Sequence, residues 1–210
     1  MTVTVDVDPA PIPSLDDRVA AATLACIARS GLAKLTVDDV ARAAGTSRAT
    51  IYRAYPAKQA LVAAAVEAEA DRITGAVVHA ATRADDLDDA VARVVLVVNR
   101  ELRACAALTF VAAHEPELLY PHLEFAGGDV LYAELGRRLI PAFVPWCADP
   151  ERAGEWVARF ALKLLWSPTP LVDPTDDAAV RRFVSAFVTP GIRTSTIPTP
   201  TTTVPVTEED

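Results

Sequence analysis

The sequence predicts an all-α protein, and three observations support that fold class. The chain has 210 residues and 16 prolines, yet Pro56 is the only proline between residues 14 and 115. The same stretch lacks the alternation of apolar and polar side chains that marks half-buried strands. It is also rich in alanine, leucine and arginine, which have high intrinsic helix propensities. We therefore expect helices to form the whole core.

Capping signals divide the first third of the chain into four helices. Two pairs have the three-residue spacing of a capping box, namely Ser14 with Asp17 and Thr36 with Asp39. Ser47 offers a third N-cap. A helix-ending residue follows each of the first three apolar stripes, at Gly31, Gly45 and Pro56. The expected helices cover residues 15–29, 36–44, 47–55 and 57–79.

Helical periodicity continues in the rest of the chain. Further helices are expected at residues 86–103, 106–115, 128–143, 150–167 and 177–188, with a shorter helical piece within 118–125. Residues 1–13 contain three prolines, and residues 194–210 are rich in threonine and proline. We therefore expect a flexible arm over residues 1–13 and a disordered tail over residues 194–210.

Composition limits the class of protein. Hydrophobic residues make up 51% of the chain and charged residues 23%, as in soluble globular domains. No secretory leader is expected, because residues 1–13 carry no basic residue. The uncharged apolar runs reach about half of the ~20 residues that a bilayer-spanning helix needs. We expect a cytoplasmic protein that makes no membrane contact.

The charge of the chain is unevenly distributed. The net charge is -8, which disfavours binding to phosphate, but residues 1–60 have a net charge of +1 and residues 61–210 a net charge of -9. Any surface that binds an anion is therefore expected near the N-terminus.

The second and third expected helices form a helix-turn-helix pattern. They are short and are joined through Gly45 and Thr46, as in motifs whose second helix enters the major groove of DNA. Ile51 and Tyr55 stand four residues apart and should face the core. The residues then left toward solvent can donate hydrogen bonds to base edges or phosphates; they are Ser47, Arg48, Thr50 and Arg53.

The run LAKLTVDDVARAAGTSRATIYRAYPAKQAL, residues 32–61, makes the pattern more specific. It resembles the DNA-binding domain of the TetR (tetracycline-repressor-like) family of bacterial transcriptional regulators, over roughly residues 15 to 65. The most specific piece is Thr50-Ile51-Tyr52-Arg53, followed by an aromatic residue, a proline and Lys58. The resemblance implies a three-helix DNA reader at residues 14–60 and a larger helical effector-binding and dimerisation domain at residues 61–193.

The resemblance also implies roles for individual residues. Phosphate contacts are expected from Thr36, Tyr52 and Lys58, and base contacts from Arg48 and Thr50. Ser47 and Arg53 are expected to divide between capping and backbone contacts. Two positions depart from the family pattern. Thr46 stands where valine is usual, and Ala54 replaces a residue that is often histidine or tyrosine, which puts one phosphate contact in doubt.

The larger half of the chain lacks the short motifs of known catalytic sites. His114, Glu115, Glu117 and His122 suggest a metal site only weakly, because Pro116 interrupts the helix and no ligand pair four residues apart survives. We expect no enzyme activity, no cofactor and no metal.

The resemblance implies instead an effector pocket and a dimer. Candidate pocket residues are Phe110, His114, Tyr120, Phe125, Tyr132 and Trp166, although for any single aromatic side chain ordinary core packing is the favoured alternative. Apolar stretches such as residues 108–111 favour a mostly apolar effector. The expected interface of a two-fold homodimer contains Trp156, Phe160, Leu164, Phe183 and Phe187, with packing inside one chain as the alternative.

Two functions remain open at this point. The first is a ligand-responsive regulator, by default a repressor released from a palindromic DNA operator by a small molecule. The second is a helical module that senses a hydrophobic ligand or partner without binding DNA. Salt-dependent binding to duplex DNA distinguishes them.

Overall fold

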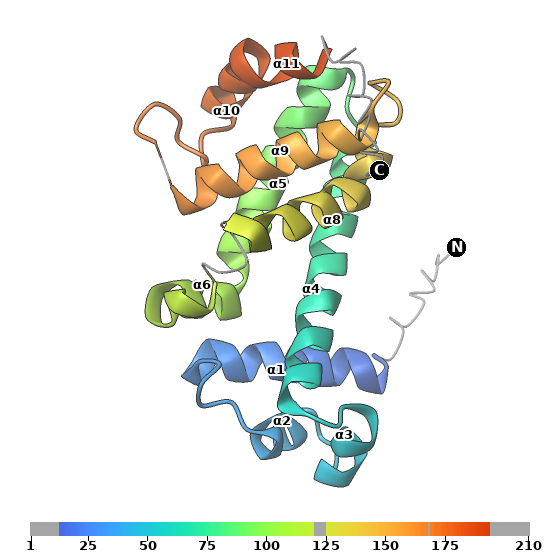
Figure 1. Cartoon of the computed structure of the whole chain (residues 1–210), viewed down its shortest axis with the longest axis vertical. Helices are drawn as coiled ribbons and strands as arrows, with labels where there is room; N and C mark the ends of the chain where they lie inside the picture. Colours follow the sequence, from blue (N-terminus) through green and yellow to red (C-terminus); the bar gives the residue numbers. More distant parts are fainter. Residues whose placement is uncertain (1–12, 120–124, 168, 194–210) are drawn as a thin grey trace, which may run out of the picture.

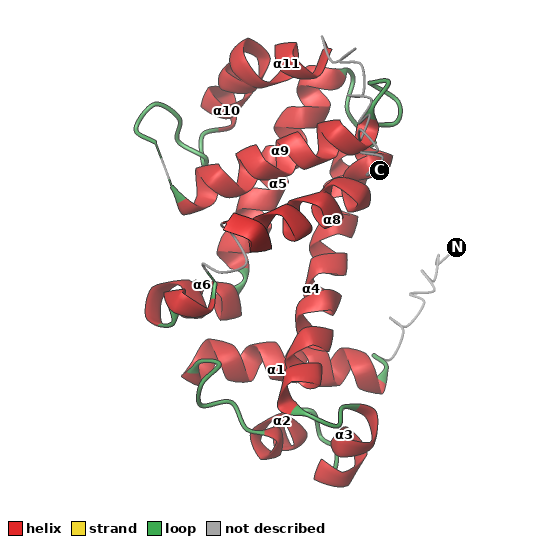
Figure 2. Cartoon of the chain, viewed as in Figure 1, coloured by secondary structure: helices red, strands yellow, loops and turns green. Residues whose placement is uncertain are grey.

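The computed structural model describes residues 13–119, 125–167 and 169–193, and for residues 125–129 the backbone alone. Within that part of the chain no element is a strand, which agrees with the all-α prediction. Figure 2 shows helices joined by short loops. None of the described helices is long and apolar enough to cross a membrane. The predicted arm, apart from Pro13, and the predicted tail lie outside the described residues.

The helices follow the predicted order closely (Figure 1). Their bounds are α1 Leu15–Ser30, α2 Val37–Ala43, α3 Arg48–Ala54, α4 Lys58–Ala81, α5 Leu87–Ala104, α6 Ala106–His114, a 3-10 turn η1 at Pro116–Leu118, α8 Phe125–Phe143, α9 Pro150–Trp166, α10 Asp177–Phe183, a π turn η2 at Val184–Val188 and α11 Thr189–Arg193.

The capping predictions are confirmed at Ser14 and corrected at Thr36. Ser14 and Asp17 form a complete capping box. At α2 the Thr36 hydroxyl accepts from the Asp39 amide at 3.2 Å, as predicted. The Asp39 carboxylate, however, accepts the Thr36 hydroxyl at 2.6 Å, not the Thr36 amide. The second box is therefore only half formed.

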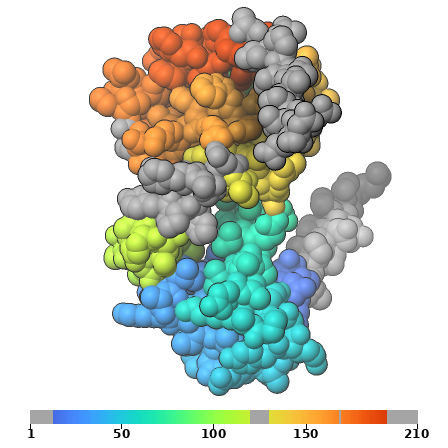
Figure 3. Space-filling view, in the orientation of Figure 1, coloured from blue at the N-terminus to red at the C-terminus, as the bar shows by residue number. Residues whose placement is uncertain are grey.

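The molecule has two parts joined by α4. In Figure 1, α1, α2 and α3 lie at the lower end, α9 to α11 lie at the upper end, and α4 runs between them. The space-filling view in Figure 3 shows the same two masses. The predicted domain boundary between residues 60 and 61 falls inside α4. Division into two domains therefore stays a prediction.

Each part has its own hydrophobic core. The lower core, which we call the head core, joins α1, α2, α3 and the start of α4, with Val40 and Ile51 almost fully buried. It also contains Ala107 and Val111 from α6, which packs on α1. The upper core joins α5, α8, α9 and α10 around Phe143, which is fully buried. The head core thus includes apolar side chains from the larger part of the chain, residues 61–193, which we call the helical half.

The predicted helix over residues 177–188 is present, but it contains an unpredicted π turn and extends further. The structure has α10, then the π turn η2, then α11 as far as Arg193. The π turn lies just before Pro190, whose ring would crowd the carbonyl four residues earlier in a regular α-helix. Asp88 and Asp89 at the start of α5 hold this segment through Ser185, Arg181 and Arg193.

Candidate nucleic-acid interface

Helices α2 and α3 form the predicted helix-turn-helix. The Thr46 amide closes the turn by donating to the Ala41 carbonyl at 3.0 Å. Gly45 has φ 64°, a left-handed conformation in which glycine carries no penalty from a β-carbon. Ile51 is 1% exposed and holds α3 against the head core, as predicted. The opposite face of α3 is therefore turned away from the protein.

That outward face carries the residues predicted to bind DNA. Ser47, Arg48, Tyr52 and Arg53 are exposed, and Thr50 is half-buried. The Ser47 and Thr50 hydroxyls lie 2.8 Å apart, and Ser47 also caps the Thr50 amide. A hydroxyl can donate once and accept twice, so these groups keep capacity for another partner.

Arg48 is held by Asp38 across the turn and by Tyr52 one helical turn further along α3. Its Nε lies 3.1 Å from Asp38 Oδ1, and its guanidinium carbon lies 5.4 Å from the centre of the Tyr52 ring. Contact with Tyr52 and the charge of Asp38 raise the pKa of Arg48, which therefore stays protonated. Because the Arg48 and Asp38 side chains are 61% and 53% exposed, solvent screens the ion pair and it contributes little to stability. DNA can compete for this guanidinium.

Lys58, at the first turn of α4, is half-buried and already has partners. Its Nζ donates to the carbonyl oxygens of Leu32 and Ala33, at 2.7 and 3.3 Å. An ammonium has three donors, so one hydrogen remains for a phosphate. Sequence reasoning proposed the phosphate contact but did not foresee that Lys58 also holds the loop between α1 and α2.

Two acidic residues of this region were not assigned a role from the sequence. Asp16 accepts the Tyr55 hydroxyl at 2.9 Å, and burial followed by this contact raises the pKa of Tyr55. Glu115 accepts the amides of Leu32 and Ala33 at 2.7 and 3.0 Å. Sequence reasoning considered Glu115 only as a metal ligand. Partners so distant in sequence leave no periodic signal that could have identified either contact.

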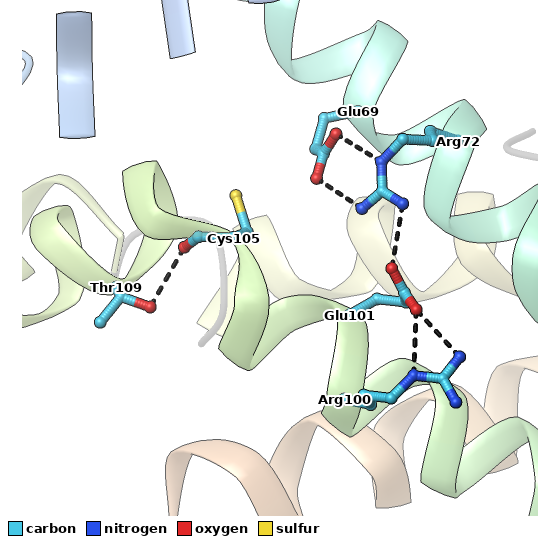
Figure 4. A network of polar contacts seen from close by, with 6 residues as sticks. All are labelled: Glu69, Arg72, Arg100, Glu101, Cys105 and Thr109. Atoms are coloured by element: carbon cyan, nitrogen blue, oxygen red, sulfur yellow. Dashed lines mark hydrogen bonds and ion pairs between the residues drawn. The ribbon is translucent and has the colours of Figure 1, made fainter. Parts of the chain in front are cut away.

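Charged side chains join α4 to α5 (Figure 4). Arg72 on α4 binds Glu69 and reaches Glu101 on α5 at 2.9 Å, and Arg100 also binds Glu101. Hydrogen bonds from Arg72 and then Arg100 hold the pKa of Glu101 below its ordinary value. The carbonyl of Cys105 next accepts the Thr109 hydroxyl at 3.1 Å, where α6 begins.

The predicted effector residues lie in different places. Phe110 and His114 on α6 stack with ring centres 4.3 Å apart, beside the head core. Tyr132 is 9% exposed in the upper core, with the Arg159 guanidinium carbon 4.4 Å from its ring centre. Trp166 is half-buried at the end of α9, and its buried indole nitrogen has no hydrogen-bond partner among the described residues. Tyr120 and the side chain of Phe125 lie outside the described residues.

The predicted dimer residues divide into exposed and buried ones. Trp156 is 55% and Phe187 73% exposed. Phe160 and Phe183 stack almost in parallel with ring centres 5.5 Å apart, and Phe183 also contacts Phe187 at 5.0 Å. Leu164 is only 4% exposed, so its side chain serves the core of the single chain.

A groove of about 700 Å³ lies between α9 and α11. Its walls include Trp146, Arg152, Trp156, Phe187 and Ile192. The predicted effector residues Phe110, His114, Tyr132 and Trp166 are not among its lining residues. The groove instead continues the exposed aromatic surface that was predicted for dimerisation.

Comparison with known proteins agrees with this arrangement. Residues 19–65 match the family of bacterial regulatory proteins named tetR. The chain is 28% identical over 178 residues, 83% of each chain, to the uncharacterized HTH-type transcriptional regulator Rv1255c of Mycobacterium tuberculosis H37Rv. Over 58 residues, 28% of this chain and 29% of the relative, it is 43% identical to the uncharacterized HTH-type transcriptional regulator Rv1556 of the same strain.

A solved structure shows the same fold. The TetR family repressor AlkX from Dietzia sp. strain DQ12-45-1b, implicated in biodegradation of n-alkanes, superposes with a TM-score of 0.60 at 22% identity. The match covers 82% of this chain and 94% of AlkX. The family match over residues 19–65, the relatives and the shared fold together support one conclusion: the chain is a DNA-binding transcriptional regulator similar to those of the TetR family, whose members are regulators rather than enzymes.

Proposed function

We propose that this regulator is a repressor that binds a palindromic DNA operator as a homodimer and releases it when a mostly apolar small molecule binds. The observation that carries the proposal is the outward face of α3, where Arg48, Tyr52 and Arg53 are exposed at the end of the molecule. Asp38 and Asp39 are the acidic residues between positions 36 and 58, and each is paired with an arginine. The head therefore presents donors rather than free carboxylates.

In this proposal, residues 14–60 act as the DNA-binding head. Arg48 and Thr50 read base edges, because both lie in the first turn of α3, which enters the major groove first. Tyr52 and Lys58 bind phosphates, with Thr36 at the start of α2. Ser47 and Arg53 contribute to capping and backbone contacts. Phosphate contacts fix the register of the protein on the duplex, and base contacts supply the sequence preference.

The dimer is proposed to form through α9 and the α10–α11 segment. Exposed Trp156 and Phe187 lie beside the groove, and large exposed aromatic side chains at one site are typical of protein interfaces. Phe160 and Phe183 support Phe187 from behind. A two-fold dimer places two heads about 34 to 36 Å apart, or a multiple of that distance, on successive major grooves.

The effector is proposed to bind within residues 61–193 among the predicted pocket residues. The Trp166 indole nitrogen and the Asn99 Oδ1 atom are buried without a partner among the described residues. Such groups are stabilised when a ligand supplies the missing hydrogen bond. Their apolar surroundings favour a ligand that is mostly apolar with few polar groups. Release follows if the effector binds better to a dimer whose heads have the wrong spacing.

Selection of duplexes from a random pool tests the DNA-binding half of the proposal. We expect an enriched palindrome, with affinity that falls steeply as salt rises. Tyr52→Phe should weaken binding to all duplexes by the same factor, because a phosphate contact carries no sequence information. Enrichment of no duplex at low salt would contradict the proposal.

A thermal-shift screen tests the effector half. Lipids, aromatic compounds, sugars and nucleotides are compared, and a ligand of the folded state raises the melting temperature. The compound that raises it should also weaken binding to the enriched duplex. Stabilisation by sugars or nucleotides alone would show that the pocket is not apolar.

A further inference from the structure

The loop between α1 and α2, residues 31–36, is held by opposite charges on two sides. On one side Glu115 accepts the amides of Leu32 and Ala33, at 2.7 and 3.0 Å. On the other side the Lys58 ammonium donates to the carbonyls of the same two residues, at 2.7 and 3.3 Å. The carboxylate comes from the end of α6, more than 80 residues further along the chain. The amides and the carbonyls of Leu32 and Ala33 therefore all take part in charge-assisted hydrogen bonds.

The chain around the carboxylate leaves room for it. Gly31 is buried, and a β-carbon there would lie 2.7 Å from Glu115 Oε1 and 2.9 Å from the Phe110 ring. The glycine has φ 83°, which turns the following amides out of the α1 direction. Phe110 and the end of α6 pack on the same glycine, so the contact belongs to the packed junction of α1 and α6.

The position of this loop fixes the direction of one hydrogen bond. Two of the three Lys58 ammonium hydrogens are engaged by the loop carbonyls, so the third has a defined direction. If the Glu115 contacts are lost, the two amides lose their partners and the loop carbonyls are free to move. Lys58 then keeps its charge but loses the fixed carbonyl partners that orient its ammonium group.

We propose that Glu115 is a positioning residue for DNA binding, which fixes the α1–α2 loop and thereby aims Lys58 at the DNA backbone. The inference rests on the proposed function, in which Lys58 donates to a phosphate. It goes beyond that function because a residue outside residues 14–60 then determines how the DNA-binding surface is positioned. The head then depends on the helical half for its full affinity.

The test compares Glu115→Gln with wild type on a labelled duplex that the wild-type chain enriches from a random pool. Glutamine keeps the size of the side chain but offers one acceptor oxygen in place of two. Dissociation constants are measured between about 50 and 200 mM salt. We expect affinity to fall by about tenfold, as for one lost charge-assisted hydrogen bond, and the salt slope to decrease by about 0.9 per subunit. Glu117→Gln, an exposed neighbour on η1, is the matched control and should equal wild type.

A second pair of variants separates positioning from general loosening of the head. In a Lys58→Ala background, Glu115→Gln should cause no further decrease of the salt slope, because the phosphate contact is already gone. An additional decrease there, or a wild-type slope in the single variant, overturns the proposal and leaves the proposed function intact. If Glu115→Gln unfolds the head, as judged by circular dichroism, Glu115→Asp carries the same test. Failure of the wild-type chain to enrich any duplex would instead contradict the proposed function itself.

Discussion

Replacing Gly31 by alanine should destabilise the head strongly. Its φ of 83° and ψ of 167° lie in a region that only glycine occupies readily, and an alanine there costs ~1–3 kcal/mol. The new β-carbon would also lie 2.7 Å from Glu115 Oε1, so the carboxylate must move. Moving it breaks the hydrogen bonds from Leu32 and Ala33, at ~1–1.5 kcal/mol each. The total is roughly 3 to 6 kcal/mol, a large part of the ~5–15 kcal/mol that stabilises a typical domain.

Alanine substitutions at two further glycines separate the backbone strain from the loss of the Glu115 hydrogen bonds. Gly45 has φ 64°, but a β-carbon added there would meet no atom within 4 Å, so Gly45→Ala should cost only the backbone strain, about 1 to 2 kcal/mol. Gly75 lies inside α4 with free space around it, and Gly75→Ala should stabilise the chain by ~0.5–1 kcal/mol. Urea unfolding followed by circular dichroism measures all three free energies.

Tryptophan fluorescence adds a second probe. The three tryptophans are Trp146, Trp156 and Trp166, and all lie in the helical half. If Gly31→Ala unfolds the head alone, circular dichroism will change at lower urea than fluorescence does. A Gly31→Ala variant as stable as Gly45→Ala would refute the reasoning, because it would show that the Glu115 contact adds nothing to the strain of the loop.

Three other predictions concern DNA, assembly and acid. Arg48→Ala should flatten the sequence preference and cost ~1–3 kcal/mol if the residue binds a base in a bidentate manner; an unchanged preferred sequence in a random-pool selection would assign it to the backbone instead. Trp156→Lys together with Phe187→Lys should convert a dimer into a 22.3 kDa monomer in sedimentation at micromolar concentration, whereas wild type that already sediments as a monomer contradicts the interface. Arg72 lowers the pKa of Glu101 in the folded state, so the ionised Glu101 carboxylate stabilises the fold above the ordinary pKa of 4.5, and this stabilisation is lost as the pH falls through the lower folded pKa. Glu101→Gln should therefore make the free energy of unfolding less dependent on pH between the ordinary and the folded pKa. An unchanged pH dependence would show that Glu101 contributes nothing to acid sensitivity.

The local rules of helix formation predicted most of the fold. The starts of α1, α2 and α3 were marked by hydroxyl side chains whose cap hydrogen bonds are made three residues along the chain, so the sequence itself carried the signal. The last helix was predicted less well. Its π turn lies just before Pro190, and a helical pattern of apolar residues does not distinguish an α turn from a π turn.

In the candidate site, too, residues placed by local helix periodicity could be predicted, and residues placed by contacts distant in sequence could not. Arg48 and Arg53 could be placed on an outer face from the positions of buried Ile51 and half-buried Tyr55 on one short helix, whereas Tyr52 was assigned through the family resemblance. Glu115 could not be assigned, because its partners are backbone amides, which any residue possesses, at positions distant in the sequence. The effector residues were predicted from the family resemblance and from the aromatic and apolar character of the middle helices. That character is shared by core residues, and Phe110 and Tyr132 accordingly lie in different parts of the structure.

The position of the head relative to the helical half is set by two routes that meet at one loop. The first is α4 itself, whose start carries Lys58 and whose middle carries the link from Arg72 to Glu101 on α5. The second runs from the end of α5 through α6 to Glu115. Because both routes end on the peptide groups of Leu32 and Ala33, α6 cannot shift along α4 without breaking contacts on one side of this loop. We therefore expect a change of packing between α4 and α5 to alter the direction of the Lys58 ammonium, even though no residue of the helical half needs to touch DNA.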